Sequence, residues 1–326
     1  MKLKFWGTRG SLPRSLDQSD LAGVIERAVR LAKNQGINTL DGFVKACKEG
    51  TLGQPSTYGG RTSCTEIISQ ERSFIVDMGS GLSDLGYQPQ SKDSPKEYTI
   101  FLTHMHWDHI MGMPFFLPIY TPRTKITIYH VHKNAPQAVQ TLFNGVNFPV
   151  KWEDLGATIV FRQIKIYQSV DLGDGLEATA FVLDHPGGCF GFRFEDRQHS
   201  VAVGVDGEYK RVSEEELGKD LKYYQDLDVL VFDAQYEIDE LASRFDWGHC
   251  SPPIGVDLAL REGIKHLIFT HHDPRGSEDR IHGMLSSAQA HLDKNLASHK
   301  KIWEKRNQPQ GPLLYSAFDG LNFEWP

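Results

Sequence analysis

The sequence predicts an α/β protein built as a single unit of 326 residues, and three observations support this class. Short β-branched or aromatic segments alternate with helix-like segments along the whole chain, which is typical of strands and helices that share one core. No Pro/Ser-rich linker divides the chain, and no repeat occurs at solenoid spacing. Hydrophobic residues make up 40% and charged residues 24% of the chain, as in an ordinary globular protein. We therefore expect one domain over residues 1–326.

Six apolar segments are predicted to be strands, because β-branched and aromatic residues are concentrated in them. They are residues 74–76, 98–102, 125–129, 201–203, 229–232 and 266–269. Helical periodicity and helix start signals predict helices between and after these strands. The expected helices cover residues 20–33, 136–143, 213–223, 252–262 and 278–305.

Residues 15–56 interrupt this alternation. Two helix-like stretches, 21–29 and 39–46, occur where strands would be expected. The first carries an apolar helix face that must be buried somewhere. We therefore expect a helical insertion near the N-terminus. It is either a lid over the active site or a packing appendage or dimer contact.

Charge and cysteine content narrow the function classes. Lys and Arg total 35 against 42 Asp and Glu, so the net charge is −7, which is unfavourable for a protein that grips long nucleic acid. The four cysteines are far apart and form no Cys-x-x-Cys pair, so neither a disulfide framework nor a thiolate zinc site is indicated. The first residues lack the apolar run of a signal peptide, and nothing in the composition indicates a membrane protein. We expect a cytoplasmic protein.

The strongest functional signal is a cluster of four potential metal ligands directly after the predicted strand at 98–102. The cluster reads His104-Met105-His106-Trp107-Asp108-His109. Imidazole and carboxylate groups suit Zn²⁺ and neighbouring first-row metals. Because this loop follows a strand, all four side chains are expected at one edge of the sheet. The alternative, a His-rich loop that is merely exposed to solvent, would explain neither the carboxylate nor the strand before it.

One loop cannot complete two coordination shells, so further ligands are expected at other strand ends. His185 follows the apolar segment 178–183 and precedes a Pro-Gly-Gly turn. Asp206 follows the apolar segment 201–205, and His271 repeats the order of strand, threonine and histidine found in the first cluster. Each residue alone could have a surface or capping role, but as a set with the first cluster they indicate metal ligands.

The pattern His-x-His-x-Asp-His at His104, His106, Asp108 and His109 resembles the signature of the metallo-β-lactamase superfamily. The resemblance implies a four-layer αββα sandwich, in which residues 6–150 supply one sheet and the later half of the chain the other. It also implies two divalent metal ions per chain, Zn²⁺ by expectation with Mn²⁺ or Fe²⁺ as alternatives. The implied ligands are His104, His106 and His185 for one ion, Asp108, His109 and His271 for the other, and Asp206 as the bridge.

Further segments narrow the resemblance to one branch of that superfamily. Residues 5–11, 58–64, 76–81, 233–236 and 248–251 are similar to the branch that contains RNase Z, the carbon-phosphorus-lyase phosphodiesterase and cyclic-nucleotide phosphodiesterases. Two positions depart from the common pattern and remove no ligand, namely Arg61 in place of Asn and Cys250 in place of Ser. RNase Z itself is disfavoured, because the chain has no long Gly/Pro-rich basic arm and is negatively charged.

The same resemblance implies roles for four polar residues. His249 would protonate the leaving oxygen or steady charge on the phosphoryl group, and Asp233 would hold His249 in its productive tautomer. Asp77 would orient the metal ligands, and Asp108 would belong to both the ligand set and the catalytic set. Capping of a helix N-terminus is the alternative interpretation for Asp77 and for His249.

Together these features predict a dinuclear metal-dependent hydrolase. In it, a metal-bridging hydroxide would attack a small phosphodiester such as a cyclic nucleotide. One alternative is an enzyme of the same fold that hydrolyses a carboxylic ester, lactone or thioester. The others are an RNA-processing nuclease and a non-catalytic metal-binding sensor. The expected partner is a small phosphodiester substrate, with no long nucleic acid and no membrane, and a homodimer is left open.

Overall fold

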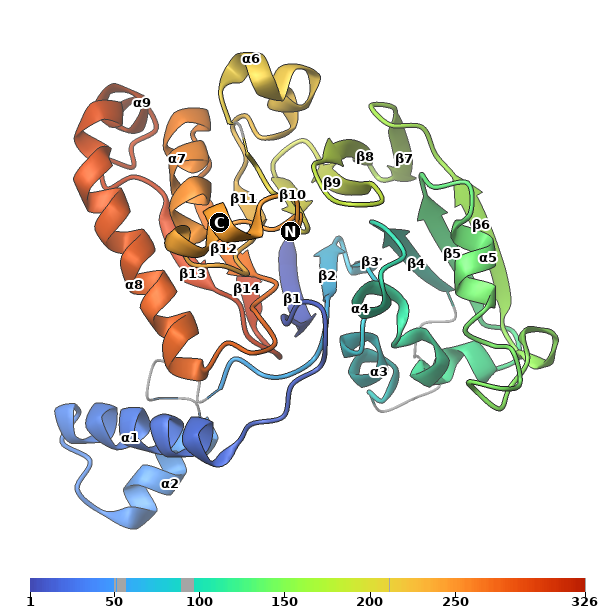
Figure 1. The fold of residues 1–326 in the computed structure, drawn as a ribbon, viewed down its shortest axis with the longest axis horizontal. Helices are drawn as coiled ribbons and strands as arrows, with labels where there is room; N and C mark the ends of the chain where they lie inside the picture. The colour runs from blue at the N-terminus through green and yellow to red at the C-terminus, as the bar shows by residue number, and fades with distance from the viewer. Residues whose placement is uncertain (50, 52–56, 89–96, 211, 326) are drawn as a thin grey trace.

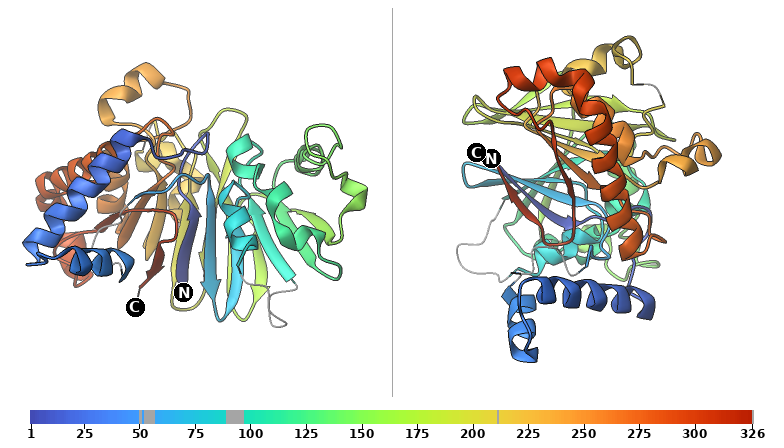
Figure 2. Two further views of the ribbon diagram at one scale, coloured as in Figure 1. Left: turned by 90° about the horizontal axis from the view of Figure 1, so that it is seen from below. Right: turned by 90° about the vertical axis from the view of Figure 1, so that its left-hand side faces the viewer.

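The computed structural model describes residues 1–49, 51, 57–88, 97–210 and 212–325. Residues 50 and 52–56 of the expected insertion therefore lie outside the described residues. Two mixed sheets of seven strands each form the centre of the molecule, with helices on their outer sides (Figure 1; Figure 2). The predicted α/β class and the sandwich of two mixed sheets are confirmed.

The first sheet has the strand order β14-β1-β2-β3-β4-β5-β6. Its strands are β1 (Lys2–Gly7), β2 (Cys64–Ser69), β3 (Arg72–Val76), β4 (Glu97–Leu102), β5 (Lys125–His130), β6 (Thr158–Gln163) and β14 (Asn322–Glu324). Pairing is antiparallel from β14 to β3 and parallel from β3 to β6. In the parallel part Ile75 pairs with Ile100 and Ile100 with Ile128, so three β-branched residues fill one row of the sheet.

The second sheet has the order β13-β12-β11-β10-β9-β8-β7. Its strands are β7 (Ser169–Gly173), β8 (Leu176–Leu183), β9 (Cys189–Glu195), β10 (Ser200–Gly204), β11 (Val229–Asp233), β12 (His266–Thr270) and β13 (Leu313–Ser316). The expected boundary between the sheets near residue 150 is wrong, because β6 and β14 both belong to the first sheet. β6 continues the parallel series beside β5, and β14 closes the other edge beside β1.

Three apolar clusters separate the four layers. The cluster between the sheets contains Phe74 and Phe101 of the first sheet and Phe192 and Phe194 of the second. The ring of Phe101 lies edge-on to both, with centroids 5.3 Å from Phe192 and 4.9 Å from Phe194, a favourable aromatic arrangement. The other two clusters lie between each sheet and its outer helices.

The helices outside the first sheet are short. They are α3 (Gly81–Gly86), α4 (Trp107–Ile110), α5 (Ala135–Gln140) and the 3-10 helices η1 (Met113–Phe115), η2 (Leu117–Tyr120) and η3 (Trp152–Asp154). Those of the second half are α6 (Glu214–Leu217), α7 (Pro252–Glu262), α8 (Glu278–Asn295), α9 (Lys300–Lys305), η4 (Gly218–Tyr223), η5 (Ile238–Arg244) and η6 (Leu296–His299). The predicted helix over 252–262 agrees with α7, whereas the predicted helix over 136–143 corresponds only to the shorter α5.

Two predicted helices are broken, each for a local reason. The segment 213–223 divides into α6 and η4 at Gly218, whose φ of 50° ends the α-helix. The segment 278–305 divides into α8, η6 and α9. Asn295 ends α8, and its side-chain amide donates a hydrogen bond of 2.8 Å to the carbonyl of His291, which competes with the helical backbone pattern.

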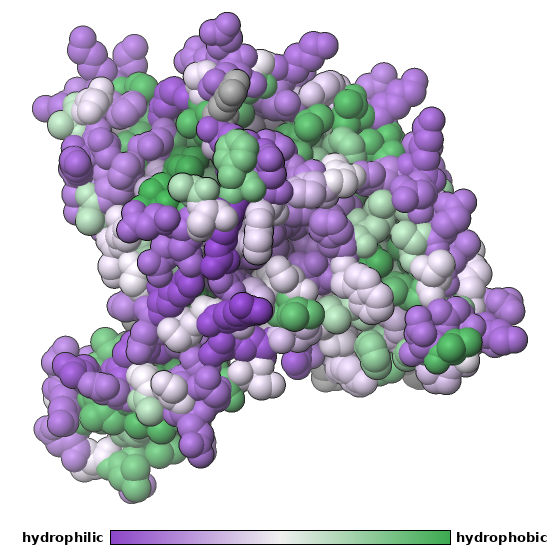
Figure 3. All heavy atoms as spheres, viewed as in Figure 1, coloured by the Kyte–Doolittle hydropathy of each residue, from purple (hydrophilic) through white to green (hydrophobic). Residues whose placement is uncertain are grey.

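The predicted helical stretch near the N-terminus is observed as α1 (Gln18–Asn34) and α2 (Leu40–Glu49), a hairpin that projects from the two-sheet body (Figure 1). Its two helices share a small apolar cluster around Ala32 and Ala46. Within this single chain the apolar face of α1 is only partly covered, with Leu21 and Ile25 50% and 51% exposed. Hydrophobic side chains are visible on the hairpin in Figure 3. A lid or a dimer contact stays a prediction.

No helix among the described residues combines the length and the apolar character needed to cross a membrane. The four cysteines are free thiols, and Cys64, Cys189 and Cys250 are buried.

Candidate metal centre

Seven histidine and aspartate side chains from both sheets meet at one edge of the sandwich. His104 and His106 follow β4, and Asp108 and His109 lie on the short helix α4. His185, Asp206 and His271 follow the ends of β8, β10 and β12. The structure thus brings together all the residues predicted as ligands, in two groups whose ligand atoms lie within 4.8 Å of one another. Their assignment as ligands stays a prediction.

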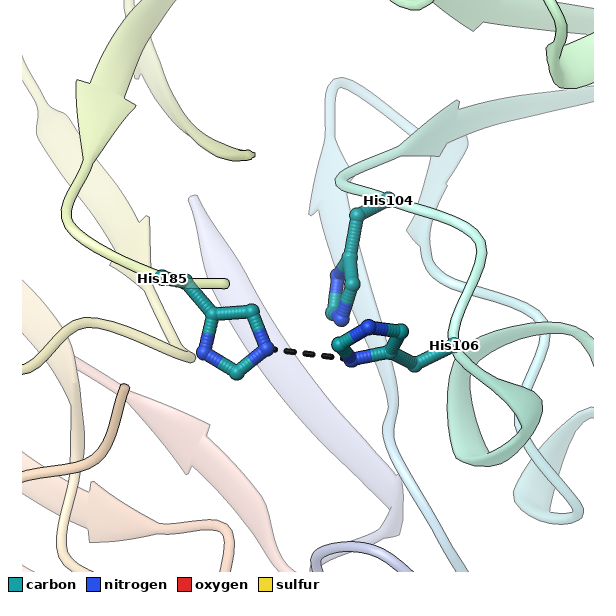
Figure 4. Close-up of side chains that lie close together, drawn as sticks. All are labelled: His104, His106 and His185. Carbon is teal, nitrogen blue, oxygen red and sulfur yellow. Dashed lines mark hydrogen bonds between the residues drawn. The ribbon is translucent and has the colours of Figure 1, made fainter. Parts of the chain in front are cut away.

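The first group consists of His104, His106 and His185, whose rings face a common space (Figure 4). Nε2 of His185 lies 3.0 Å from Nδ1 of His106, and the ring centroids of His104 and His106 are 4.4 Å apart. Nδ1 of His185 lies 2.9 Å from the carbonyl oxygen of Gly248, to which it can donate. That bond leaves Nε2 of His185 with a lone pair directed at the common space.

The second group consists of Asp108, His109, Asp206 and His271. Nε2 of His109 lies 2.5 Å from Oδ2 of Asp206 and 3.2 Å from Oδ2 of Asp108. Nε2 of His271 lies 3.1 Å from the same Asp108 oxygen. Asp206 Oδ2 is also 3.7 Å from Nε2 of His104, so this carboxylate lies between the two groups.

The residues fit a pair of divalent cations, because several of their buried polar atoms lie close together but make no contact with hydrogen-bond geometry among the described residues. These atoms are Nε2 of His104, Nε2 of His109 and both carboxylate oxygens of Asp206. A buried polar atom without a partner is costly. Nitrogen and oxygen lone pairs that converge in this way are the donor set that Zn²⁺ and related ions take.

Asp77 and Ser11 hold two of the candidate ligands. The Asp77 carboxylate lies 2.7 Å from Nδ1 of His109 and accepts hydrogen bonds of 2.9 Å from the backbone N–H and the hydroxyl of Thr103. The backbone N–H of Ser11 donates a bond of 2.7 Å to Asp108. Partners of this kind fix the tautomer and direction of metal ligands.

Three residues at the site have unusual backbone geometry. Asp77, Asp206 and His271 follow the ends of β3, β10 and β12 with φ angles of 67°, 64° and 59°. This left-handed region is sparsely populated by residues other than glycine, although Asp and His are among those that adopt it more often. Such geometry stores strain and is concentrated at functional sites.

His249 and Asp233 form a further pair beside the second group. Nδ1 of His249 lies 3.0 Å from Oδ2 of Asp233 and 3.2 Å from Oδ1 of Asp206. The other Asp233 oxygen accepts a 2.9 Å bond from the backbone N–H of Cys250. Asp233 is fully buried and ends β11. The backbone around Cys250 therefore holds this carboxylate against the His249 ring.

The carboxylates make the site attractive to cations. Burial alone would lower the pKa values of His249 and His271, but Asp233 and Asp206 outweigh it and raise them to about 10 and about 9. Burial raises the pKa of the Asp108 carboxyl, yet His109 and His271 lower it overall. His272, adjacent in sequence to His271, is different: burial lowers its pKa to about 3, and its Nε2 lies 2.9 Å from the carbonyl oxygen of Ala317.

Sequence reasoning gave no individual role to four supporting residues, namely Ser11, Thr103, Cys189 and Gly248, although segments 5–11 and 248–251 carry part of the family resemblance. Ser11 and Gly248 act through backbone atoms, which a residue type does not reveal. The glycine at position 248 is required by the structure, since its φ is 83° and a Cβ there would lie 2.1 Å from Nδ1 of His185. Only glycine fits this position. The Cys189 thiol lies 3.5 Å from Nδ1 of His104 and gave no signal in the sequence.

The fold and this cluster define a metal-dependent hydrolase, and comparison with known proteins gives the family. Residues 74–272 match the model of the family described as "Beta-lactamase superfamily domain". This range includes the His-x-His-x-Asp-His pattern and all seven candidate ligands. The chain belongs to the beta-lactamase superfamily, as the sequence motifs indicated.

Similar proteins include members of the branch that the sequence motifs indicated, the one that contains RNase Z. Ribonuclease Z of Lactococcus lactis is 22% identical in an alignment of 297 positions that covers 78% of this chain and 96% of the relative. The solved structure of human tRNase Z, short form, has a TM-score of 0.59 at 15% identity and covers 100% of both chains. A diphosphatase from the PhnP family has a TM-score of 0.58 at 15% identity and covers 100% of this chain and 98% of its own.

Proposed function

We propose that this chain is a dinuclear phosphodiesterase that hydrolyses a small phosphodiester such as a cyclic nucleotide. The observation that carries the proposal is the pair of His249 and Asp233 beside the two groups of candidate ligands. Hydrolysis of a phosphodiester expels an alkoxide, and a positioned acid that protonates it accelerates the reaction. The names of the relatives, a ribonuclease and a diphosphatase, support chemistry at phosphorus.

Two divalent cations, by expectation Zn²⁺ with Mn²⁺ or Fe²⁺ as alternatives, would supply Lewis acidity and a nucleophile derived from water at neutral pH. His104, His106 and His185 would hold one cation, Asp108, His109 and His271 would hold the other, and Asp206 would contact both. Asp77 would keep the His109 ring in the orientation that its hydrogen bond now gives it. Asp108 is thus both a ligand and, with Asp77, part of the machinery that positions the reacting groups.

His249 has the geometry of a proton donor. Its Nδ1 is directed at Asp233, and its Nε2 makes no hydrogen bond to the described part of the chain. An imidazolium held in this way presents its Nε2–H to a departing oxygen, while Asp233 stabilises the positive charge of the ring. We place this activity in a reducing cytoplasm, because the cysteines are free and three of them are buried.

An RNA-processing nuclease is the second candidate, because Ribonuclease Z of Lactococcus lactis matches over 96% of its length. The net charge of −7 argues against it, since a protein that neutralises several RNA phosphates needs a basic surface. The two candidates also differ in salt dependence, which is shallow when one phosphate is engaged and steep when many are.

The test is an activity screen of metal-loaded protein. The substrates are bis-(p-nitrophenyl) phosphate, 2′,3′- and 3′,5′-cyclic nucleotides, phosphomonoesters, lactones, thioesters and a structured precursor tRNA. We expect hydrolysis of the p-nitrophenyl diester and of at least one cyclic nucleotide, with monoesters much poorer. Steeply salt-dependent cleavage of the RNA alone would assign the nuclease function instead. Turnover of lactones or thioesters without any diester would assign a carboxylic ester hydrolase.

A further inference from the structure

A cavity of about 770 Å³ opens beside His185, on the side of the site formed by the second sheet. Its walls come from the end of β8, the loop after β10, the α6–η4 segment and the loop that precedes His249. This volume lies in the range of small-molecule binding sites. His185 belongs to the first group of candidate ligands, so the cavity adjoins the place where a phosphoryl group would bind.

The floor of the cavity is mostly apolar. Leu183, Tyr209 and Tyr224 are buried there. The hydroxyl groups of the two tyrosines lie 2.9 Å apart and hydrogen-bond to each other. Phe245 is 62% exposed at the rim, with Nζ of Lys210 4.6 Å from its ring centroid. The exposed part of the ring can cover the body of a bound group.

The charged side chains described around the cavity are mostly acidic. Asp184 and Asp220 line it, and Lys210 lies beside them. Nζ of Lys210 lies 3.4 Å from Asp184 and 3.5 Å from Glu208, and it also pairs with Asp246. Carboxylates therefore offset the positive charge of this lysine, and an anion that entered the cavity would be repelled.

We infer that this cavity receives one alcohol moiety of the phosphodiester and selects moieties that carry no negative charge. The inference rests on the proposed phosphodiesterase function and narrows its substrate class. The apolar floor and Phe245 pack against the body of the moiety, and the rim carboxylates accept hydrogen bonds from its hydroxyl or amino groups. A further phosphate or carboxylate on that side of the substrate meets like charge and is excluded.

A matched series of p-nitrophenyl diesters tests this inference, because all members share one leaving group. The second alcohol is 3-aminopropanol, propanol or 3-hydroxypropionate, which is cationic, neutral or anionic. With metal-loaded wild-type protein, we expect kcat/KM for the cationic and neutral diesters to exceed that for the anionic one by about tenfold, from like-charge repulsion at short range. Phe245→Ala should raise KM for the neutral diester.

Two variants should move this preference in opposite directions. Asp184→Asn removes a negative charge from a side chain that is 61% exposed. It should lower the ratio of kcat/KM between the cationic and the anionic diester about three- to fivefold. Lys210→Gln removes a positive charge and should raise that ratio by a similar factor. Asp174→Asn is the matched control. This exposed aspartate lies on the turn between β7 and β8, at the opposite end of β8 from the cavity, and pairs with Arg72. Its substitution should leave the kcat/KM ratio unchanged. Thermal unfolding checks that each variant is folded.

The outcomes separate this inference from the proposed function. If the wild-type protein hydrolyses the diesters and no cavity variant changes their relative kcat/KM, the inference is wrong and the phosphodiesterase function stands. If the metal-loaded wild-type protein hydrolyses no phosphodiester at all, the proposed function is wrong and the inference falls with it.

Discussion

Asp77 supports the candidate ligand His109 but holds no metal itself in the proposed arrangement. It contacts His109 at 2.7 Å and Thr103 through two hydrogen bonds of 2.9 Å, and it is 1% exposed. We expect Asp77→Ala to weaken Zn²⁺ binding about 10- to 100-fold, as for other lost partners of metal-ligating histidines. Competition titration with a zinc chelator measures this. Asp84→Ala, at a partly exposed aspartate paired with Arg61, is the control and should leave the affinity unchanged.

We expect His249 to transfer a proton and not to hold a metal ion. His249→Ala should keep both metals and lower kcat about 10²- to 10⁴-fold, the range for a lost general acid. The loss should be smaller for p-nitrophenolate, which leaves without protonation, than for an alkoxide. Metal analysis and kinetics with both leaving groups check this. An equal loss for both would show that His249 positions the substrate or stabilises charge instead.

At the scale of elements, a buried ion pair joins the first loop to α8. Arg9 and Glu278 are 0% and 1% exposed and lie 3.1 Å apart. Arg9 also donates to the carbonyl oxygens of Asp273 and Gly276. Glu278 further accepts a 2.8 Å bond from the backbone N–H of Tyr58. This cluster fixes the loops on either side of the metal centre.

Glu278→Ala should therefore lower the free energy of unfolding by about 3–5 kcal/mol, because it leaves the Arg9 charge buried and unpaired. Urea denaturation followed by fluorescence measures the change. Glu26→Ala removes an exposed partner of Arg30 within α1 and should leave the free energy of unfolding nearly unchanged. A loss below about 1 kcal/mol for Glu278→Ala would mean that water or other groups replace the carboxylate.

The sequence predicted elements well where local signals were strong. The apolar strands β4, β11 and β12 and the helix α7 lie where β-branched residues and a Pro-Pro start indicated. The six predicted strands left out the edge strands β6, β7, β13 and β14 and the interior strands β1, β2 and β9. Apolar and polar residues are mixed in all of these strands, so their apolar runs are short. The assignment of β14 to the first sheet depends on its pairing with β1, at a separation of more than 300 residues, which no local pattern reports.

More of the candidate site than of the surrounding fold could be predicted from the sequence. Every histidine and aspartate proposed as a ligand follows a strand end, so residue type and position together indicated it. The hydrogen bonds from Ser11 and to Gly248 use backbone atoms. The cavity beside His185 combines segments from residues 182 to 245. Both depend on the packing of distant segments and could not be predicted from a motif.

At the scale of the whole molecule, the two sheets meet at the metal centre. His104, His106, Asp108 and His109 come from the first sheet, whereas His185, Asp206 and His271 come from the second. Each group of candidate ligands contains members from both sheets. Cations bound there would join the two halves of the sandwich, because the unfolded chain does not hold these side chains together.

Metal binding should therefore stabilise the whole fold. A ligand at 100 times its Kd adds about 2.7 kcal/mol to the stability, so Zn²⁺ added to chelator-treated protein should raise Tm by about 5 °C or more. Asp206→Ala should lose most of this shift, since that carboxylate contacts both groups. His291→Ala removes a surface histidine that pairs with Asp257 on the helical side, and it should keep the full shift. A zinc-dependent rise in Tm that survives Asp206→Ala but disappears in His291→Ala would place the stabilising ion at the surface and not between the sheets.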